Sequence, residues 1–94
     1  NFPRPFEAMA WKSEAFPHDV KDGSHRCAMT TDLTWRVGVT GRTEAEIRSL
    51  LGKADTEEGG LPHYYMLCPS FLDVYVLELK WQDGRVASAL VRDT

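Results

Sequence analysis

The apolar positions of this chain recur with a helical period in its first half and with a strand period in its second half. In the first half, Met29 and Leu33 lie four residues apart, and Val37 continues the row. This spacing places side chains on one face of a helix. We therefore predict a first helix over residues 25–36, ended by the glycines that follow it.

A second helix, from Glu44 to Leu51, has the clearest start and stop signals. Thr43 is followed three residues later by Glu46, which matches a capping box, because the hydroxyl and the carboxylate can each bind a backbone N–H left open at a helix start. Gly52 comes directly after the last apolar residue, where helices commonly end. The apolar stripe of this helix consists of Ile47, Leu50 and Leu51.

Runs of β-forming residues follow Pro62 and predict three strands, over residues 63–68, 72–81 and 85–92. The segment before them, residues 53–62, has no apolar period and predicts a loop. Asp83-Gly84 lies between the last two runs and is the strongest short signal for a hairpin. The strands should therefore be antiparallel neighbours in sequence order.

Residues 1–24 contain prolines and scattered aromatics without a sustained period. We predict an extended arm whose aromatics hold it against the domain, since each buried aromatic contributes roughly 1.5 to 3 kcal/mol. A short helix over residues 7–12 would form part of this arm.

The central predicted strand has two different faces. The face expected to pack against the helices carries Tyr75, Leu77, Leu79 and Trp81. The opposite face carries Val74, Val76, Glu78 and Lys80. A sheet face with two valines beside charges is either covered by the arm or kept for a partner, and both alternatives stay open at this point.

A chain of 94 residues builds one hydrophobic core. We predict an α+β fold in which two short helices pack on a three-stranded antiparallel sheet, in the order helix-helix-strand-strand-strand. A single domain spans residues 1–94 and comprises an N-terminal arm at residues 1–24, a helix pair at 25–52 and an antiparallel sheet at 62–94.

Charge and hydropathy narrow the classes of partner. The net charge is −3, and acidic and basic residues are interleaved, so no face concentrates the positive potential that nucleic acid requires. We expect no nucleic-acid partner. No apolar run approaches the ~20 residues that cross a bilayer, and no signal-peptide pattern is present. We expect membrane association only through a processed lipid anchor outside this chain.

The two cysteines, Cys27 and Cys68, have two alternative states. They form one disulfide in an oxidising compartment, or they stay two small apolar side chains in a reducing one. The even count permits pairing without requiring it.

The sequence around the second helix resembles a family signature. The runs GRTEAEI at residues 41–47 and LLGKAD at residues 50–55 resemble the "GMTrxEVxxLLGxPD" signature of the SmpA/OmlA group of small bacterial envelope lipoproteins, with an arginine and an alanine in place of the signature's methionine and proline. The likeness extends over most of the chain, through Trp11-Lys12, the run from Arg26 to Leu33 and the run from Asp73 to Val86.

This resemblance implies a helix pair on an antiparallel sheet, as in the β-lactamase inhibitory protein, whose fold the group shares. It also implies residence in the bacterial periplasm or cell envelope, with a cytoplasmic location as the alternative if the cysteines are free. The role that it implies is binding or assembly without chemistry.

The sequence predicts no catalytic residue and no cofactor. No serine or cysteine lies in the signature of a strained nucleophile turn, and the acidic residues fall on caps, loops or an exposed strand face. One set of zinc-binding residue types occurs, His25, Cys27, His63 and Cys68. Its spacings are not those of structural zinc sites, so we expect no metal.

Aromatic residues concentrate in the sheet half, and tyrosine and tryptophan dominate binding hot spots. The expected function is a non-catalytic, macromolecule-binding domain of the bacterial cell envelope that acts by protein-protein interaction. The alternative is an inhibitor or immunity-type protein that blocks a partner enzyme. The residues expected to contact a protein partner are Tyr64, Phe71, Val74 and Val76.

Overall fold

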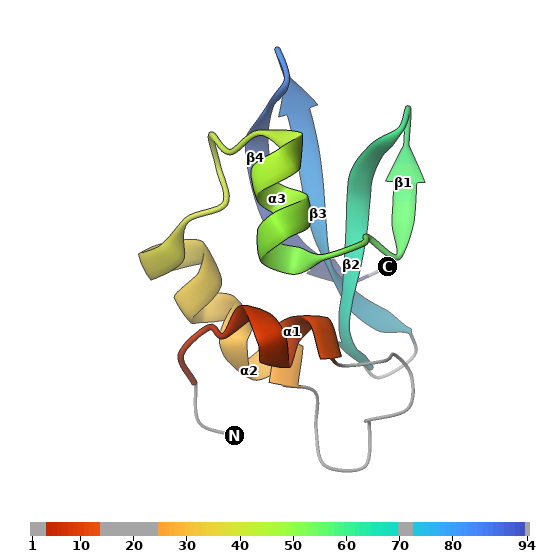
Figure 1. The fold of residues 1–94 in the computed structure, drawn as a ribbon. Coiled ribbons are helices and arrows are strands. Elements are labelled where there is room, and N and C mark those ends of the chain that lie inside the picture. Colours follow the sequence, from red (N-terminus) through yellow and green to blue (C-terminus); the bar gives the residue numbers. More distant parts are fainter. Residues whose placement is uncertain (1–3, 14–24, 70–72, 94) are drawn as a thin grey trace.

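The computed structural model describes residues 4–13, 25–69 and 73–93. These residues form helices on one side of an antiparallel sheet of strand order β1-β2-β3-β4 (Figure 1). The predicted α+β class is confirmed, but the sheet has four strands instead of three. The elements are α1 (Ala8–Ser13), α2 (His25–Asp32), the π-helical segment η2 (Leu33–Val37), α3 (Glu44–Leu51), β1 (Thr56–Glu58), β2 (Leu61–Pro69), β3 (Val74–Gln82) and β4 (Arg85–Asp93).

The extra strand, β1, lies where the sequence predicts a loop. Its three residues are all exposed, so they carry no alternation of apolar and polar side chains that could reveal a strand. Gly59 and Gly60 have positive φ angles of 62° and 81° and form the turn that brings β1 back along β2. Pairing with β2, and not local preference, therefore makes this segment a strand.

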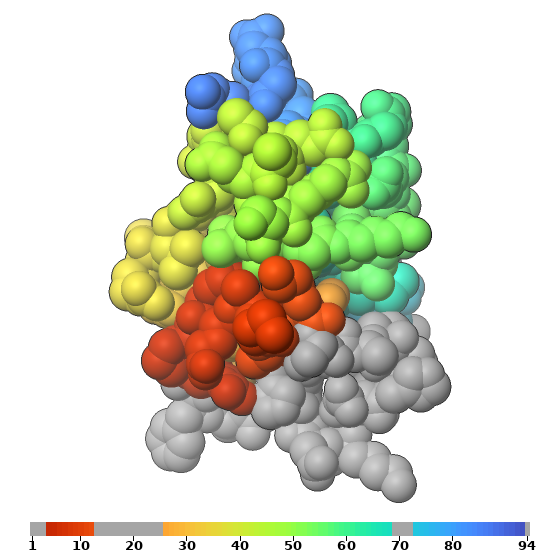
Figure 2. Space-filling model, in the orientation of Figure 1, coloured from red at the N-terminus to blue at the C-terminus, as the bar shows by residue number. Residues whose placement is uncertain are grey.

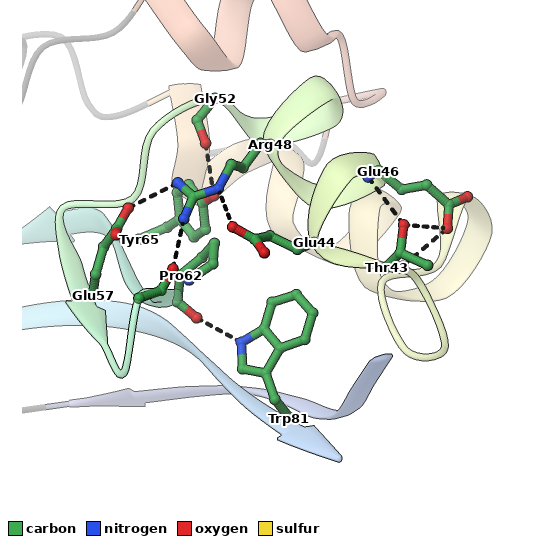
Figure 3. A network of polar contacts seen from close by, with 10 residues as sticks. Thr43, Glu44, Glu46, Arg48, Gly52, Glu57, Pro62, Tyr65 and Trp81 are labelled. Atoms are coloured by element: carbon green, nitrogen blue, oxygen red, sulfur yellow. Dashed lines mark hydrogen bonds and ion pairs between the residues drawn. The ribbon is translucent and has the colours of Figure 1, made fainter. Parts of the chain in front are cut away.

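The helical elements follow the sequence prediction closely. In α3, the Thr43 hydroxyl accepts a hydrogen bond from the Glu46 backbone N–H, and the Glu46 carboxylate accepts one from the Thr43 backbone N–H, so the capping box is confirmed (Figure 3). The hydrogen bonds that the Thr43 backbone N–H and hydroxyl donate to the Glu46 carboxylate lower the pKa of Glu46. The first predicted helix begins as α2 and widens at Leu33 into η2. The short helix expected in the arm is α1.

A single hydrophobic core lies between the helices and the sheet. Trp11 of α1 is fully buried in it, which confirms that an aromatic of the arm holds this segment against the domain. Seen from the helical side, α3 lies in front of the sheet and α1 lies below α3 (Figures 1 and 2). The largest fully buried side chains of the core include Trp11, Met29, Leu33, Ile47, Leu51, Tyr65, Leu67, Leu77 and Leu79.

Tyr75 departs from the predicted core. It shares the helix-facing side of β3 with Leu77 and Leu79, but it is 40% exposed. Its strand partners are Cys68 and Asp93, near the ends of β2 and β4, so it lies at the margin of the core. The predicted face is correct, and the predicted burial is wrong for this residue.

Arg26 ties three segments together at the lower edge of the core. It is 6% exposed and donates to the Trp11 carbonyl oxygen at 3.1 Å, to the Met66 carbonyl oxygen at 3.0 Å and to the Asp55 carboxylate at 3.3 Å. Its guanidinium also lies 5.0 Å from the centroid of the Trp11 ring. Because α1 is too short to be stable alone, these contacts help to fix it on the domain.

A disulfide joins Cys27 of α2 to Cys68 of β2, with 5.9 Å between the Cα atoms. Of the two states that the sequence left open, the structure has the bonded one. A register shift between Met66 and Cys68 marks a bulge in β2. Without it, the alternation that buries Tyr65 and Leu67 would turn Cys68 to the opposite face. The bulge therefore lets Cys68 face α2.

Candidate binding surface

The sheet divides into a fork at its upper end. Between β2 and β3 the ladder ends at the pair Tyr64–Glu78. Beyond this pair, β2 continues at residues 61–63 beside β1 alone, whereas β3 continues at residues 79–82 beside β4 alone. The hairpin of β1 and β2 thus diverges from β3 (Figure 1).

Arg48 holds the hairpin against α3 and away from β3. Its guanidinium contacts the carboxylates of Glu44 and Glu57, each at 2.8 Å, and the Gly60 carbonyl oxygen at 3.0 Å (Figure 3). The hydrogen bond from Arg48 lowers the pKa of Glu57. Arg48 of α3 therefore holds the β1–β2 hairpin in the position that opens the fork.

Two further hydrogen bonds hold the strands around the fork on the helix-facing side. The Trp81 indole N–H donates to the Pro62 carbonyl oxygen at 2.7 Å, across the gap between β3 and β2 (Figure 3). The Tyr65 hydroxyl donates to the Gly52 carbonyl oxygen at 2.8 Å, and burial raises the pKa of Tyr65 to about 12. The Trp81 bond spans the gap between β3 and β2, and the Tyr65 bond ties β2 to the end of α3.

A cleft of about 430 Å³ lies in the fork. It is of the size of a small-ligand or side-chain pocket, and its walls combine apolar and charged groups. The side chains along it include Glu58, Leu61 and His63 from the hairpin and Glu78, Lys80 and Trp81 from β3.

A second bulge turns His63 to the face of the sheet that carries no described helix, here called the outer face. Thr56 pairs with Tyr64 and Glu57 with Pro62, so His63 is the extra residue of β2. Its ring stacks on the next ring, that of Tyr64, with centroids 4.1 Å apart and planes 18° apart. Regular alternation would put consecutive side chains on opposite faces, so the bulge creates this pair.

Four side chains from three strands close a ring of contacts on the outer face. Glu78 of β3 is contacted from both sides, by a hydrogen bond with His63 Nε2 at 3.1 Å and by an ion pair with Arg92 Nε at 3.1 Å. Arg92 of β4 also donates to the Tyr64 hydroxyl, and its guanidinium lies 5.4 Å from the centroid of the Tyr64 ring. We call His63, Tyr64, Glu78 and Arg92 the outer ring.

Within the outer ring, the positively charged Arg92 is more exposed than the negatively charged Glu78. The Glu78 side chain is 13% exposed and both of its oxygens are engaged, whereas the Arg92 side chain is 49% exposed. The hydrogen bond to Tyr64 raises the pKa of Arg92, and an arginine guanidinium is charged in proteins without such a shift. Glu58 lies 4.0 Å from His63 Nδ1. The ring thus combines an aromatic surface with a half-exposed cation.

The four residues expected to bind a partner have different places. Tyr64 belongs to the outer ring, and Val74 is half-buried on the same face. Val76 is 1% exposed, so this side chain is not available for contact in the structure. Arg92 lies opposite Val76, and Tyr64 lies opposite Glu78. The side chains of Arg92 and Tyr64 meet over β3 and shield Val76. Phe71 lies outside the described residues.

Sequence reasoning missed three members of the outer ring. Glu78 was placed on the correct face but interpreted as a solvated charge. Arg92 joins the ring through the register of β4 on β3, and His63 joins it through a bulge, and no short motif marks either feature. A large apolar side chain, Leu90, lies opposite Glu78 and is 58% exposed.

The helical side also has an exposed aromatic that the sequence did not single out. Trp35, on η2, is 85% exposed. It lies next to Arg36, which makes a bidentate ion pair with Asp32 at 2.7 Å. The hydrogen bond from Arg36 lowers the pKa of Asp32.

The metal hypothesis concerned His25, Cys27, His63 and Cys68, and both sulfur atoms of this set belong to the disulfide. Within residues 4–13, 25–69 and 73–93, no three His, Cys, Asp or Glu side chains group to hold a metal ion. No helix in the same ranges is long and apolar enough to span a membrane.

Comparisons of the chain with protein-family models, with curated proteins and with solved structures find no match. The resemblance to the SmpA/OmlA group therefore stays a prediction from the residues quoted above.

Proposed function

We propose that this chain is a non-catalytic protein-binding domain whose partner docks on the outer face of the sheet. The observation that carries the proposal is the contact between Tyr64 and Arg92, which covers β3 and leaves the cation half-exposed. Tyrosine and arginine are the residue types enriched at binding hot spots.

Preorganisation supports this use of the surface. Arg92 is held by Glu78 on one side and by Tyr64 on the other, so little side-chain freedom remains to be lost when a partner binds. Ordering a long side chain at an interface costs about 0.5–1.5 kcal/mol. A partner with a carboxylate would meet an arginine that is already in place.

The surroundings of the outer ring supply the other parts of an interface. Leu90 offers an exposed apolar contact beside the ring, and the cleft in the fork can accept a partner side chain against Trp81. An interface typically combines an apolar or aromatic centre with a polar rim. The described outer face contains both within neighbouring strands.

The proposed location is the bacterial periplasm or cell envelope. It rests on the resemblance to the SmpA/OmlA group, and the bond between Cys27 and Cys68 is compatible with it, because structural disulfides persist in oxidising compartments.

The proposal is tested by affinity capture with the intact domain and two charge-reversal variants. Arg92→Glu reverses the charge at the outer ring. Arg36→Glu is the matched control, because it also reverses an exposed arginine that is paired with a carboxylate, but on the helical side. We expect one protein to be retained by the intact domain and the control, and to bind Arg92→Glu at least tenfold more weakly.

The opposite pattern would place the binding surface on the helical side, near Trp35, and would overturn the proposal. Equal retention by all three forms would do the same. The identity of the retained protein then separates assembly in the envelope from inhibition of an enzyme, because an inhibitor should capture one enzyme and abolish its activity.

A further inference from the structure

His63 lies between two carboxylates that come from different strands. Its Nε2 atom is 3.1 Å from Glu78 Oε2, on β3, and its Nδ1 atom is 4.0 Å from the carboxylate of Glu58, the last residue of β1. A neutral imidazole has only one N–H, whereas the protonated ring has one on each nitrogen. Only the charged ring can therefore donate toward both carboxylates at once.

The surroundings of His63 hold its ring in this position. The ring stacks on that of Tyr64, and the side chain is only 18% exposed. The bulge in β2 brings both rings to the outer face of the sheet. The imidazole is thus fixed beside the carboxylate of Glu78, where a change in its charge acts on the outer ring.

Glu78 is shared between His63 and Arg92. One of its oxygens contacts the imidazole, and the other lies 3.1 Å from Arg92 Nε. While His63 is neutral, the negative charge of Glu78 balances the positive charge of Arg92. Once His63 is protonated, two cations share one carboxylate, and the outer ring has a net positive charge. Protonation therefore makes the outer ring more attractive to a negatively charged group.

The other described charged groups around His63 balance one another. Glu58 and Lys80 both line the cleft in the fork and have opposite charges. Glu57, the second acidic residue of β1, is paired with Arg48 on the helical side. The net charge of this part of the outer face therefore changes with the charge of His63.

We propose that the outer ring binds an acidic segment of its partner protein, and that protonation of His63 strengthens this binding. This inference rests on the proposed function, because it names the chemistry of the partner and a regulation of the same surface. Histidine changes its charge between about pH 5 and about pH 8, so the affinity rises as the pH falls through this range. Exposed charge pairs contribute little, and the expected gain is about two- to fivefold.

The first test follows the isolated protein by NMR between about pH 5 and about pH 8. The Arg92 Nε–Hε resonance should shift with the same midpoint as the His63 ring resonances, because Glu78 joins the two groups. His63→Gln keeps an N–H donor but does not titrate, so the Arg92 shift should vanish. His25→Gln, the matched control, removes the histidine that begins α2 and should leave the shift unchanged.

The second test measures the binding of an acidic probe. Hexa-aspartate, whose carboxylates are charged at both pH values, is titrated into the protein at about pH 5.5 and about pH 7.5. The Arg92 and Tyr64 resonances should give a Kd about two- to fivefold lower at the lower pH. Hexa-lysine, the probe of opposite charge, should show no such gain. His63→Gln should bind hexa-aspartate equally at both pH values.

An Arg92 resonance that does not follow the titration of His63 would overturn the regulation, and so would equal affinities at the two pH values. Hexa-aspartate that perturbs no resonance of the outer ring would overturn the acidic partner. The capture experiment is made at a single pH and asks only whether a protein is retained. A retained protein together with any of these outcomes would therefore overturn this inference and leave the proposed function in place.

Discussion

On each side of the sheet lies an arginine that contacts several neighbours, Arg26 of α2 on the helical side and Arg92 of β4 on the outer face, and the two differ in burial. Arg26, on the helix-facing side, is 6% exposed and donates to two backbone carbonyl oxygens and a carboxylate. Arg92, on the outer face, is half-exposed and is held by Glu78 and Tyr64.

The difference shows how burial decides what a polar network contributes. A group that satisfies buried carbonyl oxygens cannot be removed without leaving them unpaired, which costs about 1–3 kcal/mol for each. Groups at the surface are solvated when a partner is lost, so exposed ion pairs contribute little. The helix-facing network is therefore suited to stability, and the outer ring is suited to recognition.

The largest expected effect comes from the covalent link between the helices and the sheet. Replacing both Cys27 and Cys68 by alanine should lower the free energy of unfolding by about 4 kcal/mol, because the bond closes a loop with a sequence separation of 41. Denaturant titrations of the variant and the oxidised parent measure this difference. Unchanged midpoints would show that the bond constrains little.

The second-largest effect should come from apolar side chains, whose contribution to the free energy of unfolding differs between the two faces of the sheet. Leu77→Ala, on the helix-facing side, should cost about 3 kcal/mol, because it opens a cavity in a packed core. Leu90→Ala removes the same atoms from an exposed position and should change the free energy of unfolding by less than about 0.5 kcal/mol. Denaturant titrations of the two variants and the parent give both values, and similar costs would remove the distinction between the faces.

The two arginines give a smaller and more specific contrast. Arg26→Met keeps an apolar stem but removes the donors, and it should cost about 2 kcal/mol because the carbonyl oxygens of Trp11 and Met66 lose their partner. Arg92→Met should cost less than about 1 kcal/mol. Thermal denaturation of the pair measures the order, and a larger loss for Arg92→Met would contradict the account.

The smallest expected effect is a dependence of stability on pH. The pKa of Glu57 lies below its ordinary value of 4.5 because Arg48 donates to it, so its contribution is complete above pH 4.5 and is lost as the pH falls through the lowered pKa. Glu57→Gln should therefore reduce the loss of stability on acidification below pH 4.5. Equal acid profiles for parent and variant would show that the contact does not couple to stability.

Features that depend on neighbouring residues in the chain could be predicted from the sequence. The capping box of Thr43 and Glu46 and the stripe of Ile47 and Leu51 are local patterns, and the structure has both. The turn at Asp83-Gly84 likewise joins β3 to β4. Each is encoded within a few residues, by hydrogen bonds or side-chain directions that hold in any fold.

The outer ring and the disulfide could not be predicted in this way. Both depend on bulges in β2, which change the direction of His63 and Cys68 by one step of the strand alternation. The burial of Val76 could not be predicted either. Regular alternation gives the face on which a side chain lies, but it does not show which neighbouring side chains cover it.

The sequence by itself determined the α+β class, the helix with its cap, the antiparallel order of the long strands and the face of β3 that holds the core, because each follows from local periodicity and turn chemistry. The tertiary structure decided the pairing of β1, the bulges, the bond between the cysteines and the meeting of Tyr64 with Arg92 over β3. These features join residues distant in sequence, and their register is selected only when the whole sheet and its helices pack together.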